Sequence, residues 1–227
     1  MLFAWPNPSL QRTLRDEAAR RALNVGRPGN ETPPSDPQII MSLRLRDVTN
    51  DDLPFIEQWL HADHVRSTWG DPGANLRLLS EPPAKGHWRA IIEADGHQVG
   101  IVLWQHPTRE ELDVAGLTDI PTSVIDIDIM IGEFDALGRG LGADAIRHVA
   151  ELALSDPTVP FVMACTGPDN LASQRAFTRA GFRRDREFDD VPNGLHVLMV
   201  RHRARAGAAR QRHRRGHGQP AAAEREC

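Results

Sequence analysis

The sequence lacks tyrosine and has only one lysine, Lys85, and two cysteines, Cys165 and Cys227, among its 227 residues. Two cysteines are too few for a disulfide framework or a four-ligand zinc site, so a reducing, cytoplasmic location is expected. No apolar run reaches the roughly 18 residues of a membrane-spanning helix, and the N-terminus lacks the basic region of a secretory signal. The ten histidines show no metal-ligand spacing, so neither a membrane nor a metal site is expected.

Charge is distributed unevenly along the chain. The formal net charge is −4, yet residues 1–40 carry a balance of +1 and residues 201–227 a balance of +6. The segment between them therefore holds 14 basic and 25 acidic side chains, a balance of −11. Such an acidic domain attracts cations and repels nucleic acid, which favours a cationic small molecule as partner and argues against DNA or RNA. The alternative that this charge serves only solubility stays open at this point.

Composition divides the chain into three parts. Residues 1–40 include a segment from Gly26 to Pro37 that is rich in Pro, Gly and polar residues, so they are predicted to form a disordered extension. Residues 203–227 are of low complexity, mostly Arg, His, Gly and Ala, and are predicted to be a disordered Arg-rich tail. Residues 41–202 are expected to form a single domain.

Within this domain the sequence predicts short, mixed elements. Asp95-Gly96 is typical of a tight turn between two strands of a hairpin. Helices are expected after Thr49, at 61–69, 140–155 and 170–180, and strands at 43–48, 87–93, 98–104, 123–132, 159–165, 183–188 and 195–200. Residues 105–122 are expected to be an acidic connection. Five side chains of the 140–155 helix are expected to face inward: Leu141, Ala145, Ile146, Val149 and Leu152. Strands precede and follow the two helices at 140–155 and 170–180. This arrangement predicts a three-layer α/β domain built around a mixed sheet.

The most informative stretch runs from Asp126 to Gly142 and combines an acidic strand, a glycine-rich turn and a helix start. Asp126 and Asp128 share one face, because side chains two apart along a strand point the same way. Glycines at 138, 140 and 142 let the main chain approach a pyrophosphate, which the N–H groups of the turn and helix then bind. The dinucleotide-binding fingerprint needs a further three-residue step, which this turn lacks. Glycine-rich turns also occur without phosphate, but here the pattern favours group transfer from a nucleotide-bearing donor.

Two motifs carry a resemblance to a known family. Leu137-Gly-Arg-Gly-Leu-Gly142 resembles motif A of the GNAT N-acetyltransferases, whose acetyl-CoA pyrophosphate lies on this turn, and residues 170–182 resemble their motif B. The resemblance covers residues 43–201 and implies the three-layer GNAT fold, an α/β (α+β) fold whose central mixed, mostly antiparallel sheet is flanked by helices. Further segments are similar to aminoglycoside 6′-N-acetyltransferases: residues 45–60, His64, Trp69-Gly70, 155–157 and 192–194.

The resemblance implies an enzyme that transfers the acetyl group of acetyl-CoA to a primary amine of a polycationic acceptor. The acceptor expected first is the 6′-amine of an aminoglycoside antibiotic, which would confer resistance. Two alternatives stay open. The amine could belong to a siderophore side chain or a polyamine, or the protein could be a weakly active module that binds acetyl-CoA or a drug.

The resemblance also assigns candidate residues. An aspartate ten residues before the first turn glycine lies beside the reactive amine in that family, and Asp128 has this spacing, which suits a general base. The residues expected to contact acetyl-CoA are Ile129, Met130, Ile131, Leu137, Gly138, Arg139, Gly140, Leu141, Gly142, Ala143, Asn170, Ser173 and Phe177. The residues expected to contact the acceptor are Trp69, Asp71, Asp119, Asp126, Asp128 and Asp169. Trp69 could equally be a core residue, and Asp126 an ordinary polar strand residue.

The sequence departs from the family pattern at two of these positions. Leu137 stands where motif A usually has Gln or Arg, which is compatible with binding by the main chain. Phe177 stands where motif B usually has a tyrosine that can protonate the departing CoA thiolate. A thiolate is weakly basic, since a comparable thiol has a pKa of about 8.5, so water or Ser173 could suffice. A monomer or homodimer is expected.

Overall fold

The computed structural model describes residues 43–191 and 193–204. The predicted N-terminal extension and nearly all of the predicted C-terminal tail lie outside the described residues. The described strands are β1 (Leu43–Asp47), β2 (His87–Ala94), β3 (His97–Gln105), β4 (Ile125–Ile131), β5 (Phe161–Thr166), β6 (Arg183–Asp190) and β7 (Gly194–His202). The described helices are α2 (Leu53–His61), α3 (Asp63–Trp69), α4 (Pro72–Ser80), α5 (Arg109–Val114), α6 (Leu141–Ser155) and α7 (Leu171–Arg179), with 3₁₀ turns η2 (Asn50–Asp52) and η3 (Phe134–Ala136).

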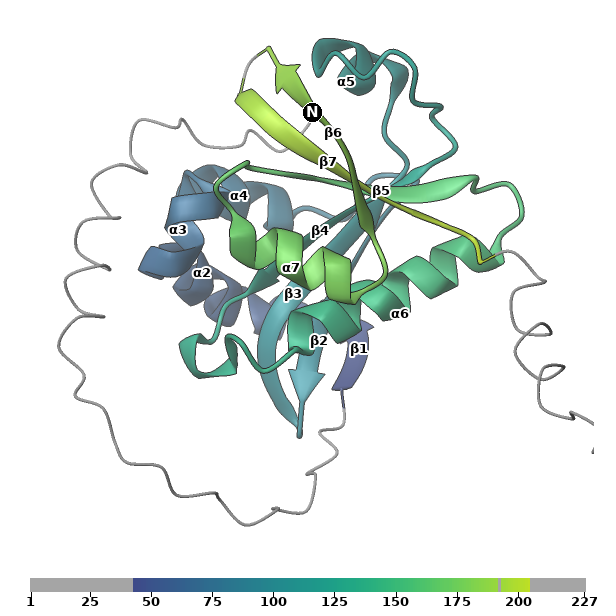
Figure 1. The fold of residues 1–227 in the computed structure, drawn as a ribbon. Helices are drawn as coiled ribbons and strands as arrows, with labels where there is room; N and C mark the ends of the chain where they lie inside the picture. The colour runs from purple at the N-terminus through teal and green to yellow at the C-terminus, as the bar shows by residue number, and fades with distance from the viewer. Residues whose placement is uncertain (1–42, 192, 205–227) are drawn as a thin grey trace, which may run out of the picture.

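The described strands form one seven-stranded sheet in the order β1-β2-β3-β4-β5-β7-β6 (Figure 1). All neighbours pair antiparallel except β4 and β5, which are parallel. The prediction of a mixed, mostly antiparallel sheet is therefore confirmed. The β2–β3 hairpin turns at Asp95 and Gly96 with φ of 51° and 83°, as the mirror-image turn of a hairpin requires.

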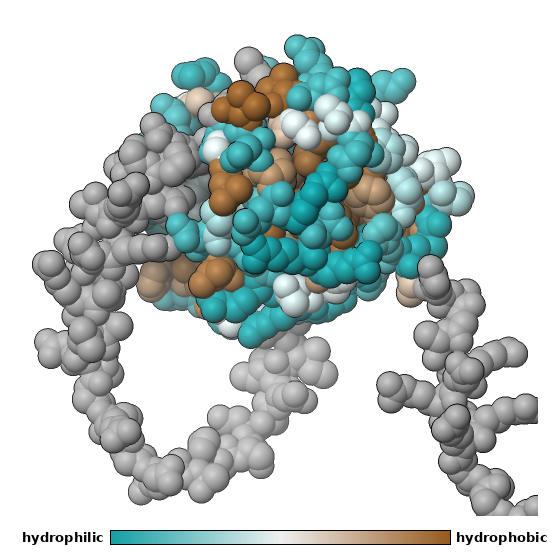
Figure 2. Space-filling view, turned by 45° about the horizontal axis from the view of Figure 1, so that its top comes forward, coloured by the Kyte–Doolittle hydropathy of each residue, from teal (hydrophilic) through white to brown (hydrophobic). Residues whose placement is uncertain are grey.

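Apolar side chains cover both faces of the sheet. Ile127 of β4 packs with Ile146 of α6 and Phe177 of α7 on one face. Met130 lies three residues further along β4, so its side chain points to the other face and packs with helices α2–α4. A third cluster lies under α5 and includes Leu112, Met163 and Leu198. On the view in Figure 2, hydrophilic residues cover most of the surface and hydrophobic ones are visible in separate groups between them.

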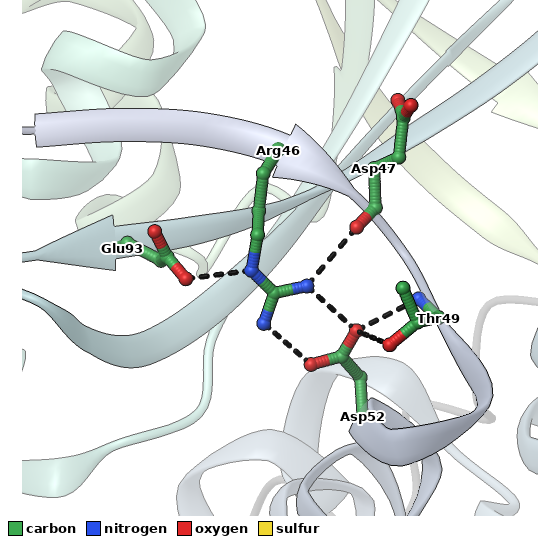
Figure 3. A network of polar contacts seen from close by, with 5 residues as sticks. All are labelled: Arg46, Asp47, Thr49, Asp52 and Glu93. Carbon is green, nitrogen blue, oxygen red and sulfur yellow. Dashed lines mark hydrogen bonds and ion pairs between the residues drawn. The ribbon is translucent and has the colours of Figure 1, made fainter.

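A partly buried ion pair fixes the start of the α2 layer against the sheet (Figure 3). The guanidinium of Arg46 on β1 donates to both carboxylate oxygens of Asp52, at 2.6 and 2.7 Å, and to Glu93 Oε1 of β2 at 2.6 Å. Asp52 is 2% exposed and also accepts from the Thr49 amide at 2.8 Å. The hydrogen bonds from Arg46 lower the pKa of Asp52 to about 2, so this carboxylate stays charged and paired. The network holds α2 in place beside β1 and β2.

Three expectations about local structure differ from the structure itself. Residues 105–122 were expected as a connection but contain α5, which begins with a capping box between Thr108 and Glu111. The helix α4 was not expected at all, since Gly70 precedes it and Gly73 lies in its first turn, yet Asp71 caps it and Pro72 starts it. The expectation that Leu152 faces inward is wrong, because it is 57% exposed. It lies about 120° around α6 from buried Ile146, outside the stripe that meets the sheet.

Candidate active site

The sheet opens between β4 and β5. Their pairing comprises only Ile125 with Val162 and Asp126 with Met163, so the rest of β4 has no partner on this side within the described residues. A cavity of about 470 Å³ lies here. Ile129 and Phe177 line it from one face of the sheet, and Asp128 and Trp69 from the other. The cavity therefore passes through the sheet at the opening.

The unpaired edge of β4 presents backbone hydrogen-bonding groups to this opening. The Met130 carbonyl points toward β3, because a Cβ built on Gly100 of β3 would lie only 2.1 Å from its oxygen. The Ile131 carbonyl points the other way and hydrogen-bonds His64 Nε2 at 3.1 Å. Since successive residues of an antiparallel strand alternate in direction, the N–H and C=O of Ile129 also point away from β3. An extended ligand could pair with this edge as an added strand.

The glycine-rich turn leads from η3 into α6 at one end of the cavity. Gly138 and Gly140 have φ of 74° and 89°, a left-handed conformation that side chains with a Cβ adopt only with strain. No heavy atom lies within 4 Å of a Cβ built at either residue, so the requirement is conformational rather than steric. Gly140 is the N-cap of the 15-residue α6 and provides no capping side chain. The first N–H groups of α6 and its dipole are thus suited to an anion.

Helix α7 forms the opposite wall of the cavity. Asn170 caps this helix, and its Oδ1 accepts a hydrogen bond from the Ser173 amide at 3.0 Å. Phe177 is buried and packs edge-to-face on Phe182, with ring centroids 5.1 Å apart. Arg175 and Arg179, one turn apart on α7, both line the cavity and bring positive charge to it.

Two carboxylates lie on the opposite face of β4. Asp128 lines the cavity, and burial raises its pKa to about 6. Asp126 is 7% exposed, and its Oδ1 has no hydrogen-bond partner. Burial first, and then the Asp128 charge, raise the pKa of Asp126 well above its usual range. At neutral pH, Asp128 is thus mostly ionised and able to accept a proton, and its charge adds to the cost of ionising Asp126.

Cys165 of β5 also lines the cavity, and its thiol is not suited to nucleophilic attack. Burial raises its pKa well above the usual range, and the charges of Asp126, Asp128 and Asp190 raise it further. The thiolate is the reactive form of cysteine, and a raised pKa keeps this thiol protonated. Direct transfer between bound reactants is therefore favoured over an acyl-enzyme intermediate at Cys165.

Most of the residues expected at acetyl-CoA are brought together around this cavity. Its lining includes Ile129, Met130, Ile131, Leu137, Gly138, Gly140, Leu141, Gly142, Ala143, Asn170, Ser173, Phe177 and, from the acceptor set, Trp69 and Asp128. Five expected residues are not in the lining: Arg139, Asp71, Asp119, Asp126 and Asp169.

Two of these five residues have evident structural contacts. Asp71 caps α4 by accepting a hydrogen bond from the Ala74 amide at 2.7 Å. Asp119 is exposed and forms an ion pair with Arg186 at 2.6 Å. Neither contact requires a ligand.

Sequence reasoning missed several residues of the lining. Arg175 and Arg179 could have been found from their spacing of four on the motif-B helix, which places them on one side. Asn75 is buried and donates from Nδ2 to the Trp69 carbonyl at 2.6 Å, which fixes the end of α3. It belongs to the unexpected helix α4, and Cys165 reaches the cavity only through the strand opening, so no local signal marked either residue.

Comparison with known proteins decides the family. The model of the acetyltransferase (GNAT) domain matches residues 48–190, which is more than half of the chain and includes both motifs. This chain belongs to the GNAT acetyltransferase family. The predicted GNAT fold and the prediction of an acetyl-CoA-dependent N-acetyltransferase are thereby confirmed.

Relatives within the GNAT family include aminoglycoside-modifying enzymes. An aminoglycoside N(6′)-acetyltransferase type 1 of Klebsiella pneumoniae is 27% identical over 170 residues, which is 71% of this chain and 84% of the relative. A kanamycin resistance protein of Rhizobium radiobacter is 35% identical over 77 residues, covering 34% of this chain and 70% of that protein.

Solved structures in the GNAT family agree with this similarity. The crystal structure of aminoglycoside acetyltransferase AAC(6′)-Ib with coenzyme A has a TM-score of 0.61 at 26% identity, and covers 71% of this chain and 95% of that one. Its complex with coenzyme A and kanamycin has a TM-score of 0.60 at 25% identity, with the same coverage. No helix in the described part of the chain is both long and apolar enough to cross a membrane.

Proposed function

We propose that this GNAT enzyme acetylates the 6′-amine of an aminoglycoside antibiotic. The observation that carries the proposal is the position of Asp128, a carboxylate with a pKa near 6, in a cavity that the acetyl-CoA motifs also line. The names of the relatives and the acidic balance of residues 41–200 support a polycationic acceptor.

The cavity residues fit the parts of acetyl-CoA. The turn at Gly138 and Gly140 and the uncapped start of α6 suit the pyrophosphate. The open edge of β4 at Ile129 suits the amide groups of the pantetheine arm, with Met130 and Ile131 beside it. Asn170, by capping α7, holds the wall formed by Ser173 and Phe177. Acetyl-CoA supplies an acetyl group that is activated as a thioester.

Asp128 prepares the acceptor for attack. Its carboxylate attracts the ammonium form of the acceptor and accepts a proton from it, directly or through water. The neutral amine then attacks the thioester carbonyl carbon and an N–C bond forms. As the tetrahedral intermediate collapses, the C–S bond breaks and the nitrogen gives up its second proton to water, which leaves the amide. The N–H of Ile129 points into the opening and is the donor that we assign to the developing oxyanion.

The thiolate departs without a tyrosine to protonate it. Phe177 occupies that position on α7 and its buried ring offers no proton. Because the CoA thiolate is weakly basic, water or the Ser173 hydroxyl is sufficient to protonate it. The absence of this acid affects the rate at which the thiolate is protonated. It does not affect the removal of the amine proton by Asp128.

Trp69 is the acceptor-side wall in this proposal. It lies across the cavity from motif B, and Asn75 fixes its backbone. The contacts of Asp71 with the Ala74 amide and of Asp119 with Arg186 add no support to the acceptor role expected from the sequence. A monomer or homodimer, and a cytoplasmic location, stay predictions.

The test is acetyl transfer itself. The purified protein is incubated with acetyl-CoA and with kanamycin, tobramycin or other aminoglycosides, and free thiol is measured. Thiol release that depends on the acceptor and is lost in Asp128→Asn supports the proposal. If no thiol above background is released across a broad aminoglycoside panel, but thiol is released with polyamines or siderophore amines, the enzyme is still an N-acetyltransferase and its acceptor is one of those amines. Acetyl-CoA binding with no transfer to any amine would leave a binding module.

A further inference from the structure

Two arginines of α7, Arg175 and Arg179, line the cavity without serving any step described above. They are one turn apart, so their side chains project from the same side of the helix. Both are exposed, and among the described residues neither guanidinium forms an ion pair. They are also the only lysine or arginine side chains in the described lining of the cavity. The donors of this arginine pair are therefore available to a bound anion.

The end of α7 that carries Arg179 lies beside the first turns of α6 (Figure 1). Arg147 of α6 donates to Asp144 Oδ1, in the first turn of that helix, at 2.5 Å and to the Arg179 carbonyl at 3.3 Å. Gly140, the N-cap of α6, precedes Asp144 by about one turn. The arginine pair is thus near the glycine turn, at the end of the cavity to which the pyrophosphate is assigned.

Two other arginines at this end of α7 are already engaged with the protein. Arg201 of β7 donates to the Ala180 carbonyl at 2.9 Å and to Glu151 Oε1 at 3.2 Å. Arg147 is held in the same way by one carbonyl and one carboxylate. These contacts satisfy the helix end and compensate both acids. The positive charge of the arginine pair is therefore left for a ligand.

Coenzyme A carries more phosphate than the glycine turn is suited to bind. Its pyrophosphate joins the pantetheine arm to adenosine, and a third phosphate, a monoester, is attached to the 3′-oxygen of the ribose. Main-chain N–H groups at the turn and helix start suit the pyrophosphate. A guanidinium fork matches the oxygens of a phosphate monoester in both geometry and charge. Since the ribose follows the pyrophosphate directly, the 3′-phosphate reaches the walls next to the turn.

We propose that Arg175 and Arg179 bind the 3′-phosphate of coenzyme A and thereby determine which acyl donor the enzyme accepts. The inference rests on the pyrophosphate position given under the proposed function. A phosphopantetheine arm on a carrier protein has the same thioester but no adenosine and no 3′-phosphate, so it gains nothing from these two arginines. The arginine pair thus makes the enzyme selective for acetyl groups carried on free coenzyme A.

The experiment removes the 3′-phosphate from the ligand and the guanidinium groups from the protein. Isothermal titration calorimetry gives the Kd of CoA and of dephospho-CoA, which differ only in that phosphate, and it requires no turnover. Both ligands are titrated into wild type, the double variant Arg175→Ala/Arg179→Ala, and the control Arg183→Ala. The control removes an exposed arginine of β6 that lies outside the described lining of the cavity. Thermal unfolding verifies that each variant is folded.

We expect wild type to bind CoA about 10- to 100-fold more tightly than dephospho-CoA, the range of one charged hydrogen-bonded contact. In the double variant this preference should fall to within about threefold, through loss of affinity for CoA alone. Arg183→Ala should keep the wild-type preference. Higher ionic strength should reduce the preference in wild type, because salt screens exposed arginines.

Equal affinity of wild type for the two ligands would overturn the 3′-phosphate site, and this comparison needs no variant. A preference that survives in the double variant would also overturn it. An equal loss of affinity for both ligands would place the arginines at the pyrophosphate and reject the proposal. Failure of the proposed function has a different signature, because absent transfer to aminoglycosides leaves the ratio of the two Kd values unchanged.

Discussion

The pKa of Asp128 leads to a definite pH dependence. Burial raises this pKa from 3.8 to about 6, so the base is about 90% ionised at pH 7 and about 10% ionised at pH 5. The value of kcat/KM should therefore fall roughly tenfold from pH 7 to pH 5 through loss of the base. An aspartate with its ordinary pKa near 3.9 would stay ionised over this range and would contribute no such loss.

The assay is the initial rate of thiol release with kanamycin, followed with a dithiodipyridine reagent that reacts in acid. Deprotonation of the acceptor amine adds a second rise at higher pH, so the control is Asp128→Asn. This variant should lose the inflection near pH 6, keep the amine-dependent rise, and be slower by about 10²–10⁴-fold at pH 7.5. A wild-type profile without an inflection between pH 5 and 7, or one shared by Asp128→Asn, would refute Asp128 as the base.

Four further predictions concern stability, binding and turnover. Because the folded-state pKa of Asp128 is raised from 3.8 to about 6, which corresponds to about 3 kcal/mol, its ionisation destabilises the fold as pH rises from about 4 to 6. Asp128→Asn should therefore raise Tm by roughly 6–12 °C at pH 7.5 but not at pH 4, and an equal gain at both values would contradict this. Arg46→Ala leaves the buried Asp52 carboxylate without its counter-charge and with only its Thr49 hydrogen bonds. Urea unfolding should show a loss of about 3–5 kcal/mol, whereas a loss below 1 kcal/mol would indicate that water replaces the arginine. Gly140→Ala forces a side chain into left-handed backbone, so the fold should lose about 1–2 kcal/mol and the KM for acetyl-CoA should rise; an unchanged KM would argue against phosphate binding at this turn. Phe177→Tyr should raise kcat much less than the 10²–10⁴-fold typical of a general acid, and a gain of that size would show that thiolate protonation limits the rate.

Local patterns allowed much of this fold to be predicted. The Asp95-Gly96 dipeptide predicted a hairpin, because the tight turn of a hairpin requires positive φ at both residues, as the structure has. The stretch from Asp126 to Gly142 was recognised as strand, turn and helix, since alternation and glycine spacing are properties of contiguous residues. The motif-B helix was likewise bounded by its cap, Asn170, and by Gly181 with φ of 91°.

The rest depends on contacts between residues far apart in the sequence. The separation of β4 from β5 is a property of two strands more than thirty residues apart, and nothing in either strand predicts where their pairing ends. The position of Cys165 beside Asp128 follows from that separation. Helix α5 was missed because its acidic residues favoured a solvated loop, whereas Glu111 is 5% exposed and its carboxylate accepts from the Thr108 amide.

The short parallel pairing in the middle of the sheet also has a mechanical consequence. Strands β1–β4 and β5–β7 are two antiparallel halves, and only Ile125 and Asp126 connect them through the β4–β5 ladder. A ligand that pairs with the free edge of β4 while resting on α7 adds a non-covalent cross-link between these halves. Saturating acetyl-CoA should thus stabilise the protein as a whole by mass action and slow amide exchange in β4 and β5 together. The nucleotide is then a structural member of the working enzyme as well as its acetyl donor.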